Sequence, residues 1–360
     1  MSPPCQPFTR GGKYLDDKDE RTKPLLKILE ILEDLERNKG KGPKYLFLEN
    51  VKNFENSNTR KRIVTLLREL NYETKEYLLS PNQIGVPNNR LRYYLTAVKQ
   101  CTSRKTGKND PNNDSALNDT MFTEFPTEYL KQGPNGIEST KPKTLKEYLN
   151  PEFDPQATMD ENTIEQYLVP LEKIMKRKHN NRFDFDIVDM DSNNTTTFTK
   201  AYGSKHLIGS GSLLLMSQQP GTLSTHLSST SQNKAATADP SSEIANSNKT
   251  HSMPDHVNRN SCFPDGYDLQ SVREILSRGD ADQIEDMFVT KKAQLRFFTP
   301  NEVAQLMNFP LKSDSFLQTA LKFPPQDGNS GISNRQQWQL LGNSVNVKVV
   351  SVLLKNMIEQ

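Results

Sequence analysis

The chain has 360 residues, enough for one large domain or two smaller ones. Only 33% of the residues are hydrophobic and the formal net charge is +2, so part of the chain is not core and any surface for a nucleic acid must be local. No apolar run reaches the roughly 18 residues of a membrane span. The cysteines Cys5, Cys101 and Cys262 are too few for a disulfide scaffold and indicate a reducing compartment, the cytoplasm or the nucleus.

The first hundred residues alternate between helical and strand patterns. Leucines and isoleucines at helical spacing predict helices over residues 22–37 and 58–70. Apolar runs predict a buried strand at Tyr45–Leu48 and further strands at residues 73–79 and 91–98. This alternation predicts an α/β domain with a mostly parallel sheet.

The middle of the chain is more polar. No aromatic residue occurs from Gly203 to Cys262, and a polar insert near residues 217–262 cannot bury enough apolar area to offset its chain entropy, so we expect it to be disordered. Order returns further on, where Thr299 and Glu302 predict a capping box at a helix start.

A cysteine lies between prolines at the start of the chain. Pro3 and Pro4 precede Cys5 and Pro7 follows it, so the loop is stiff and holds the thiol in one place. Cysteine is intrinsically nucleophilic, which makes Cys5 a candidate for covalent catalysis. The alternative is an exposed tail with an incidental cysteine.

Glu49 follows the predicted strand directly and is itself followed by Asn50 and Val51. That is the carboxyl edge of the sheet, where α/β proteins place ligands, and a carboxyl group there can give a proton or a hydrogen bond to a bound molecule. The alternative is a surface glutamate that ends a strand.

Arg90 and Arg92 alternate along the start of the third predicted strand, so they point to the same side. Two guanidiniums on one side suit a phosphate or a carboxylate. The alternative is a solvated strand face.

Taken in this order, the Pro-Cys loop, the Glu-Asn-Val run and the paired arginines resemble the cytosine-5 methyltransferases, and Leu341–Val345 resembles that family's last motif. Within the family the chain resembles the tRNA-aspartate branch, through Pro3–Arg10, Glu49–Glu55 and Phe198–Gly203. The last segment is similar to that branch's Cys-Phe-Thr region, although Thr197 stands in place of the cysteine.

The resemblance implies a reaction and a set of residues. Cys5 would add to carbon 6 of a cytosine, Glu49 would protonate ring nitrogen 3, and Arg92 with Arg90 would hold the target. S-adenosylmethionine would supply the methyl group, with cofactor contacts from Pro4, Asn343, Ser344 and Val345. Substrate contacts would come from Gln6, Asn50, Thr199 and Lys200. No metal ion is expected.

The implied fold is an incomplete Rossmann-like S-adenosylmethionine-dependent methyltransferase domain, of class α/β, with a smaller target-recognition region. Residues 1–100 would form the catalytic domain, residues 101–292 the recognition region with its disordered insert, and residues 293–360 a segment that returns to the catalytic domain. The implied partner is tRNA at its anticodon loop, because a base leaves its stack most easily in a loop, and we expect a monomer.

Members of the family carry a glycine-rich turn and a ribose-binding acid ahead of the Pro-Cys loop, whereas Cys5 is the fifth residue here. We therefore expect an N-terminally truncated domain that lacks roughly 60–80 residues, or two to three βα units. Such a domain would expose a sheet edge or a hydrophobic helix face, and Cys5 would lie on a terminus that frays.

Two alternatives to a tRNA methyltransferase stay open. One is a catalytically inactive truncated form that serves as an RNA- or protein-binding module through residues 95–330. The other is a DNA cytosine-5 methyltransferase, which would use the same catalytic residues.

Overall fold

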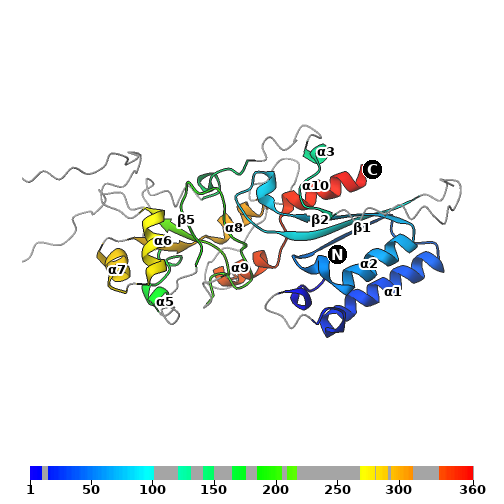
Figure 1. Ribbon diagram of the computed structural model, residues 1–360, viewed down its shortest axis with the longest axis horizontal. Coiled ribbons are helices and arrows are strands. Elements are labelled where there is room, and N and C mark those ends of the chain that lie inside the picture. Colours follow the sequence, from blue (N-terminus) through cyan, green and yellow to red (C-terminus); the bar gives the residue numbers. More distant parts are fainter. Residues whose placement is uncertain are drawn as a thin grey trace, which may run out of the picture.

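The computed structural model describes residues 1–9, 15–100, 121–130, 141–149, 164–175, 185–204, 209–216, 268–279, 281–290, 293–310 and 332–359. These residues form two units, each built around its own sheet (Figure 1). The polar insert predicted near residues 217–262 lies outside the described residues.

The first unit has a four-stranded sheet with helices on both faces (Figure 1). Its strands are β1 (Tyr45–Val51), β2 (Tyr72–Leu79), β3 (Arg92–Lys99) and β4 (Met121–Phe122). Its helices are α1 (Lys23–Arg37), α2 (Asn58–Glu69), α3 (Thr127–Leu130) and α10 (Val347–Ile358). The two helices and three strands predicted in the first hundred residues are confirmed.

The strand order is β1-β3-β2-β4, and β3 pairs antiparallel with both of its neighbours. The prediction of a mostly parallel sheet is therefore wrong for the described strands of this sheet, in which only β2 and β4 pair in parallel. The connection from β2 to β3 holds a 3-10 turn, Pro81–Ile84, and no helix. Because a parallel neighbour needs a longer crossover, usually a helix, β3 returns antiparallel beside β2.

Each face of this sheet has its own core. On one face Leu25 and Leu29 of α1 and Leu67 of α2 pack against strand residues such as Leu48. On the other, Leu353 of α10 belongs to a cluster with buried side chains of β2 and β3. A fully buried leucine contributes about 1.5–3 kcal/mol to stability, so α10 holds the end of the chain firmly on the sheet.

The second unit contains a three-stranded sheet, in which β5 pairs parallel with β6 and β6 antiparallel with β7. Its strands are β5 (Ile187–Val188), β6 (Leu213–Met216) and β7 (Gln294–Phe297). Its helices are α5 (Leu171–Met175), α6 (Leu269–Arg278), α7 (Ala281–Glu285), α8 (Pro300–Leu306) and α9 (Asn334–Gly342). The described residues between 293 and 359 are divided between the two units, since β7, α8 and α9 pack in this core and α10 packs on the first sheet.

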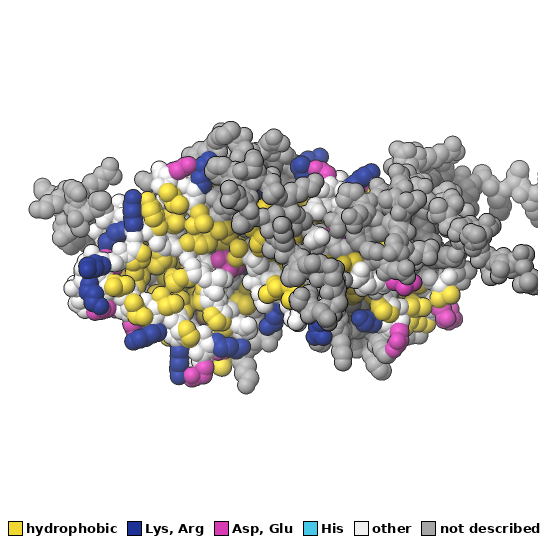
Figure 2. Space-filling view, turned by 180° about the vertical axis from the view of Figure 1, so that it is seen from behind, with side chains coloured by type: hydrophobic (Ala, Val, Ile, Leu, Met, Phe, Trp, Pro, Cys, Tyr) yellow, Lys and Arg dark blue, Asp and Glu magenta, His cyan; other side chains and the backbone are white. Residues whose placement is uncertain are grey.

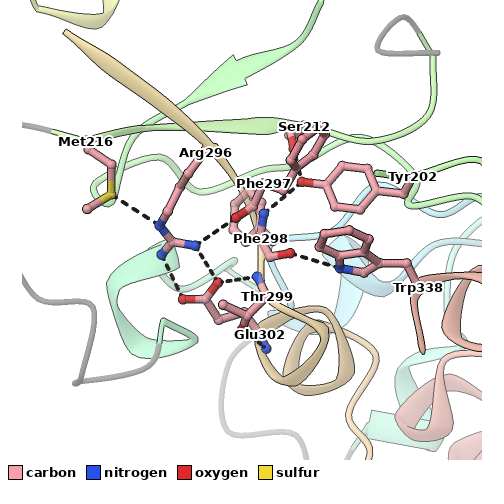
Figure 3. A network of polar contacts seen from close by, with 9 residues as sticks. All are labelled: Tyr202, Ser212, Met216, Arg296, Phe297, Phe298, Thr299, Glu302 and Trp338. Atoms are coloured by element: carbon pink, nitrogen blue, oxygen red, sulfur yellow. Dashed lines mark hydrogen bonds and ion pairs between the residues drawn. The ribbon is translucent and has the colours of Figure 1, made fainter. Parts of the chain in front are cut away.

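A buried polar network fixes β7 to α8 and α9 (Figure 3). The side chains of Arg296 and Glu302 are fully buried and form a bidentate ion pair with N–O distances of 2.7 and 2.8 Å. The main-chain N–H of Thr299 donates to Glu302 at 2.8 Å, which confirms the predicted capping box. The indole N–H of Trp338 donates to the carbonyl of Phe298 at 3.0 Å and joins α9 to the same strand end.

Hydrophobic side chains gather on one face of the half of the molecule that holds the four-stranded sheet (Figure 2). In that unit, Ile28 and Ile31 of α1 are 43% and 49% exposed. Within the described ranges, no helix has both the length and the apolar composition needed to cross a membrane.

Candidate active site

The residues before Cys5 run along the free edge of β1. The amino group of Met1 donates to the carbonyl of Phe47 at 2.5 Å, and the N–H of Glu49 donates to the carbonyl of Met1 at 2.9 Å. The amide of Asn50 then donates to the carbonyl of Pro3 at 3.3 Å. The expectation of a frayed terminus is wrong, because these hydrogen bonds fasten it to the strand.

The residues after Cys5 are anchored by aromatic packing. Phe8 is 3% exposed, and its ring forms a T-shaped pair with the ring of Phe54 at a centroid distance of 4.7 Å. The N–H of Phe8 donates to the carbonyl of Cys5 at 3.0 Å, closing the 3-10 turn Gln6–Phe8. Cys5 is a free, half-buried thiol at the start of this turn, so it is held from both sides and is still reachable.

Glu49 lies inside β1 near its carboxyl end, because the strand runs on to Val51. Its carboxylate is buried, and one oxygen accepts a hydrogen bond from the hydroxyl of Ser2 at 2.7 Å. The other oxygen lies 3.6 Å from Nε of Arg92, beyond the length of a hydrogen bond. The structure thus brings Glu49, Arg92 and the Cys5 loop together at one edge of the sheet.

Arg90 has a different environment from Arg92. The strand begins only at Arg92, so Arg90 lies in the loop before it, buried, and donates to the main-chain carbonyls of Phe198, Gly342 and Ser344. Burial, and next the charge of Arg92, lower the pKa of Arg90 to about 9, which still leaves it a cation at neutral pH. The two guanidiniums therefore bind different partners and do not form one anion clamp.

The loop that holds Arg90 is bonded to the segment that carries the Cys-Phe-Thr resemblance. Thr195 accepts from the amide of Asn88 at 2.9 Å, and its carbonyl accepts from the N–H of Asn89 at 2.8 Å. The hydroxyl of Thr197 donates to the carbonyl of Asn89 at 2.7 Å. Thr197 thus serves as a tether at the position where the resembling branch has a cysteine.

The predicted substrate and cofactor segments lie against each other. A Cβ added to Gly342 would lie 2.3 Å from the main chain of both Thr199 and Lys200. The backbone of that substrate segment therefore rests directly on the end of α9, where Asn343–Val345 begins. Asn343 is exposed, and Ser344 and Val345 are half-buried.

The remaining predicted residues differ in accessibility. Pro4 and Lys200 are exposed, Gln6 and Thr199 are half-buried, and Asn50 is buried. The Oε1 atom of Gln6 is buried and has no hydrogen-bond partner among the described residues.

Sequence reasoning missed two residues beside the Cys5 loop. Arg21 donates two hydrogen bonds, of 2.8 and 2.7 Å, to the buried Asp19. These bonds lower the pKa of Asp19 to about 2. The 3-10 turn Glu20–Thr22 that carries Arg21 packs against the turn Gln6–Phe8. The only signal in the sequence is a charged run ahead of α1, which a solvated helix start would also show.

Comparison with known proteins matches this arrangement to one family. A model of C-5 cytosine-specific DNA methylases matches residues 1–359. The chain belongs to this family. The loop that carries Cys5 and the strand end that carries Glu49 lie side by side in this chain.

Individual members are similar over nearly the whole chain. A tRNA (cytosine(38)-C(5))-methyltransferase of Spodoptera frugiperda is 32% identical over 359 residues, which cover 100% of this chain and 78% of that protein. The human protein of the same name is 28% identical and is covered to 81%. A solved structure of a mutant Spodoptera frugiperda DNMT2 aligns with a TM-score of 0.57 at 29% identity, covering 99% of this chain and 78% of that one.

Proposed function

We propose that this family member methylates carbon 5 of a cytosine in tRNA, at the anticodon loop of an aspartate-type tRNA. The observation that carries the proposal is the clamped loop ahead of Cys5, in which Ser2 donates to Glu49 and Pro3 accepts from Asn50, while Arg92 lies 3.6 Å from Glu49. The choice of tRNA rests on relatives that bear the name tRNA (cytosine(38)-C(5))-methyltransferase and align over this whole chain.

The residues divide the covalent chemistry between them. The sulfur of Cys5 forms a bond to carbon 6 of the ring, and the displaced electron pair moves toward nitrogen 3, where Glu49 supplies a proton. Carbon 5 then becomes nucleophilic. After carbon 5 has gained its methyl group it loses its proton to a base, and the bond from carbon 6 to sulfur breaks with its electron pair leaving on sulfur. Nitrogen 3 returns its proton to Glu49, which restores the ring, the carboxyl group and the thiolate of Cys5.

Arg92 acts on this step through charge. Its Nε lies near one oxygen of Glu49 while Ser2 holds the other. The carboxyl group is thus oriented but keeps room to bond a ring nitrogen. Arg92 also has a donor fork that suits the base or its phosphate.

S-adenosylmethionine supplies the methyl group when it is bound. The polar groups of Asn343 and Ser344 are exposed or half-buried beyond the end of α9, and amides and hydroxyls suit the polar end of an amino-acid-like ligand. These residues, with Val345 and Pro4, would hold part of the cofactor.

The proposed substrate contacts come from both units. Gln6 offers a buried, unpartnered amide oxygen next to Cys5, and a buried acceptor without a partner is costly unless a ligand satisfies it. Thr199 and the exposed Lys200 lie at the end of α9, where Lys200 suits a phosphate. Asn50 acts through the loop, by holding Pro3. We further propose that the protein works as a monomer in the cytoplasm or the nucleus.

The test is the transfer of labelled methyl groups from S-adenosylmethionine to unmodified aspartate tRNA by the purified chain, with bisulfite sequencing to locate the product. Wild-type protein should label one cytosine of the anticodon loop. Cys5→Ala should abolish labelling, whereas Cys101→Ala, the same change outside the Pro-Cys loop, should leave it intact. Labelling that survives in Cys5→Ala would contradict the assignment of the nucleophile.

Duplex DNA is the second candidate substrate, because a Dictyostelium discoideum relative named DNA (cytosine-5)-methyltransferase is 29% identical over 368 residues. Labelling of duplex DNA in preference to tRNA would decide for this candidate. Tight tRNA binding without transfer to either substrate would instead indicate an inactive RNA-binding module.

A further inference from the structure

Three segments that are distant in the sequence meet at the side chain of Arg90. Its Nη1 donates to the carbonyl of Phe198 at 2.9 Å, and its Nη2 donates to the carbonyls of Gly342, at 3.2 Å, and Ser344. Because the acceptors are main-chain atoms, the contact does not depend on the side chains of Phe198 or Ser344. The contact therefore depends on the guanidinium of Arg90, whose planar fork can reach several oxygens at once.

Gly342 brings two of these segments into backbone contact. A Cβ at this position would lie 2.3 Å from the carbonyl carbon of Thr199 and 2.3 Å from the N of Lys200. Both are main-chain atoms and cannot rotate away as a side chain would. Only glycine lets the end of α9 lie so close to this segment.

We propose that Arg90 and Gly342 form a joint that positions the substrate segment Thr199–Lys200 against the cofactor segment Asn343–Val345. This inference rests on the proposed function and adds a role for two residues that do not touch the reacting atoms. Arg90 is a positioning residue in this scheme. It lies two residues before Arg92, the first residue of β3, and so fixes the position of the second-unit segments relative to that strand.

A second glycine of the same interface provides a matched control. Gly203 packs on α9 as well, where an added Cβ would lie 2.2 Å from two ring carbons of Trp338. Alanine at Gly203 therefore strains the packing of the same helix against a side chain, and the φ of +71° at Gly203 adds backbone strain. General loosening of the second unit would affect both glycine variants alike.

The experiment compares Gly342→Ala with Gly203→Ala. Because a misplacement of about 1 Å near a reacting group can cost about 100-fold in rate, Gly342→Ala should lower kcat/KM by about 100-fold, mainly through the KM for tRNA. Gly203→Ala should lower the melting temperature to a similar degree, while the KM for tRNA stays within about twofold. Equal losses of kcat/KM in the two variants would refute the positioning role of the joint and would indicate a general loss of packing in the second unit.

Arg90→Lys provides a second variant in case Gly342→Ala does not fold. A lysine keeps the charge but offers a single ammonium group, so the KM for tRNA should rise about tenfold while kcat changes less. An unchanged KM in a folded Arg90→Lys protein would refute the positioning role.

Two readouts separate this inference from the proposed function. Equilibrium binding of aspartate tRNA and hydrogen exchange of the amide of Thr199, which donates to the carbonyl of Ser210 at 2.9 Å, need no methyl transfer. If the wild-type chain transfers no methyl group, the proposed function fails. Weaker tRNA binding and faster exchange in Gly342→Ala would then still support the joint, and unchanged values of both would refute it.

Discussion

The active-site edge of the first unit and the core of the second each hold an arginine paired with a glutamate. In the core, Glu302 accepts two hydrogen bonds from Arg296 and one from the main chain of Thr299, and both charged side chains are fully buried. At the edge, Glu49 accepts one hydrogen bond from Ser2 and lies 3.6 Å from Arg92. The two pairs have the same chemistry but differ in how completely they are satisfied.

This difference separates a structural pair from one that can act on a ligand. A carboxylate whose oxygens are all hydrogen-bonded within the protein has no acceptor left for a ligand. Removing its partner would leave an unpaired buried charge, which is strongly destabilising. Glu49 keeps one oxygen without a hydrogen bond to Arg92, so a ring nitrogen can approach it. Arg60 and Glu76 form another structural ion pair of this type, with bidentate hydrogen bonds of 2.6 and 2.5 Å.

The strongest test of this contrast is to neutralise the two carboxylates in turn. Glu49→Gln should lower the rate of methyl transfer by about 100- to 10,000-fold, the usual contribution of a general acid, because an amide cannot give up a proton to nitrogen 3. The free energy of unfolding should change less than in Glu302→Gln, because Glu49 accepts one hydrogen bond and lies 3.6 Å from Arg92. Single-turnover kinetics and urea unfolding measure the two effects.

Glu302→Gln should show the reverse pattern. Removing one member of a buried pair costs about 3–5 kcal/mol, so the urea midpoint should fall sharply. Under conditions where the variant is still folded, the rate of transfer should stay near that of the wild type. A Glu49→Gln protein as unstable as Glu302→Gln would show that both pairs are structural.

Local patterns in the sequence were enough to predict helices α1 and α2 and the start of α8. Leucine spacing located α1 and α2, and the sequence around Thr299 predicted the capping box of α8. These features depend on a few neighbouring residues.

Long-range contacts could not be read from the sequence in the same way. The carbonyl partners of Arg90 lie 108, 252 and 254 residues away. Every residue has a main-chain carbonyl, so the residue types do not identify these acceptors. The antiparallel return of β3 also depends on what the chain does between strands, which apolar runs do not report. The paired-arginine pattern is compatible with a shared ligand and with two separate ones, and only the fold shows that the partners are separate.

A smaller effect is expected from the tether between the two units. Thr197→Val keeps the shape of the side chain but removes its hydrogen bond to the carbonyl of Asn89. The expected loss is about 0.5–1.5 kcal/mol of unfolding free energy, measured by urea unfolding. Thr196→Val, a change of the same kind one residue earlier, removes a contact with Ser212 inside the second unit. If the tether holds the units together, tRNA affinity should fall in the first variant and stay constant in the second.

The smallest effect concerns Asp19 and Arg21 beside the Cys5 loop. The side-chain hydrogen bonds from Arg21 lower the pKa of Asp19 from 3.8 to about 2 in the folded protein. A carboxyl group whose pKa is depressed by folding stabilises the fold above its unfolded pKa and loses that contribution as the pH falls through the folded value. The contribution should therefore be complete above about pH 4 and fade toward pH 2, where the turn that packs on Gln6–Phe8 loosens. Because Arg21 is half exposed, salt should weaken the pair.

Asp19→Asn should flatten the curve of unfolding free energy against pH between these two pH values. At pH 7 the variant should lose no more than the contribution of this one pair. An unchanged acid limb in Asp19→Asn would show that other carboxylates govern acid unfolding.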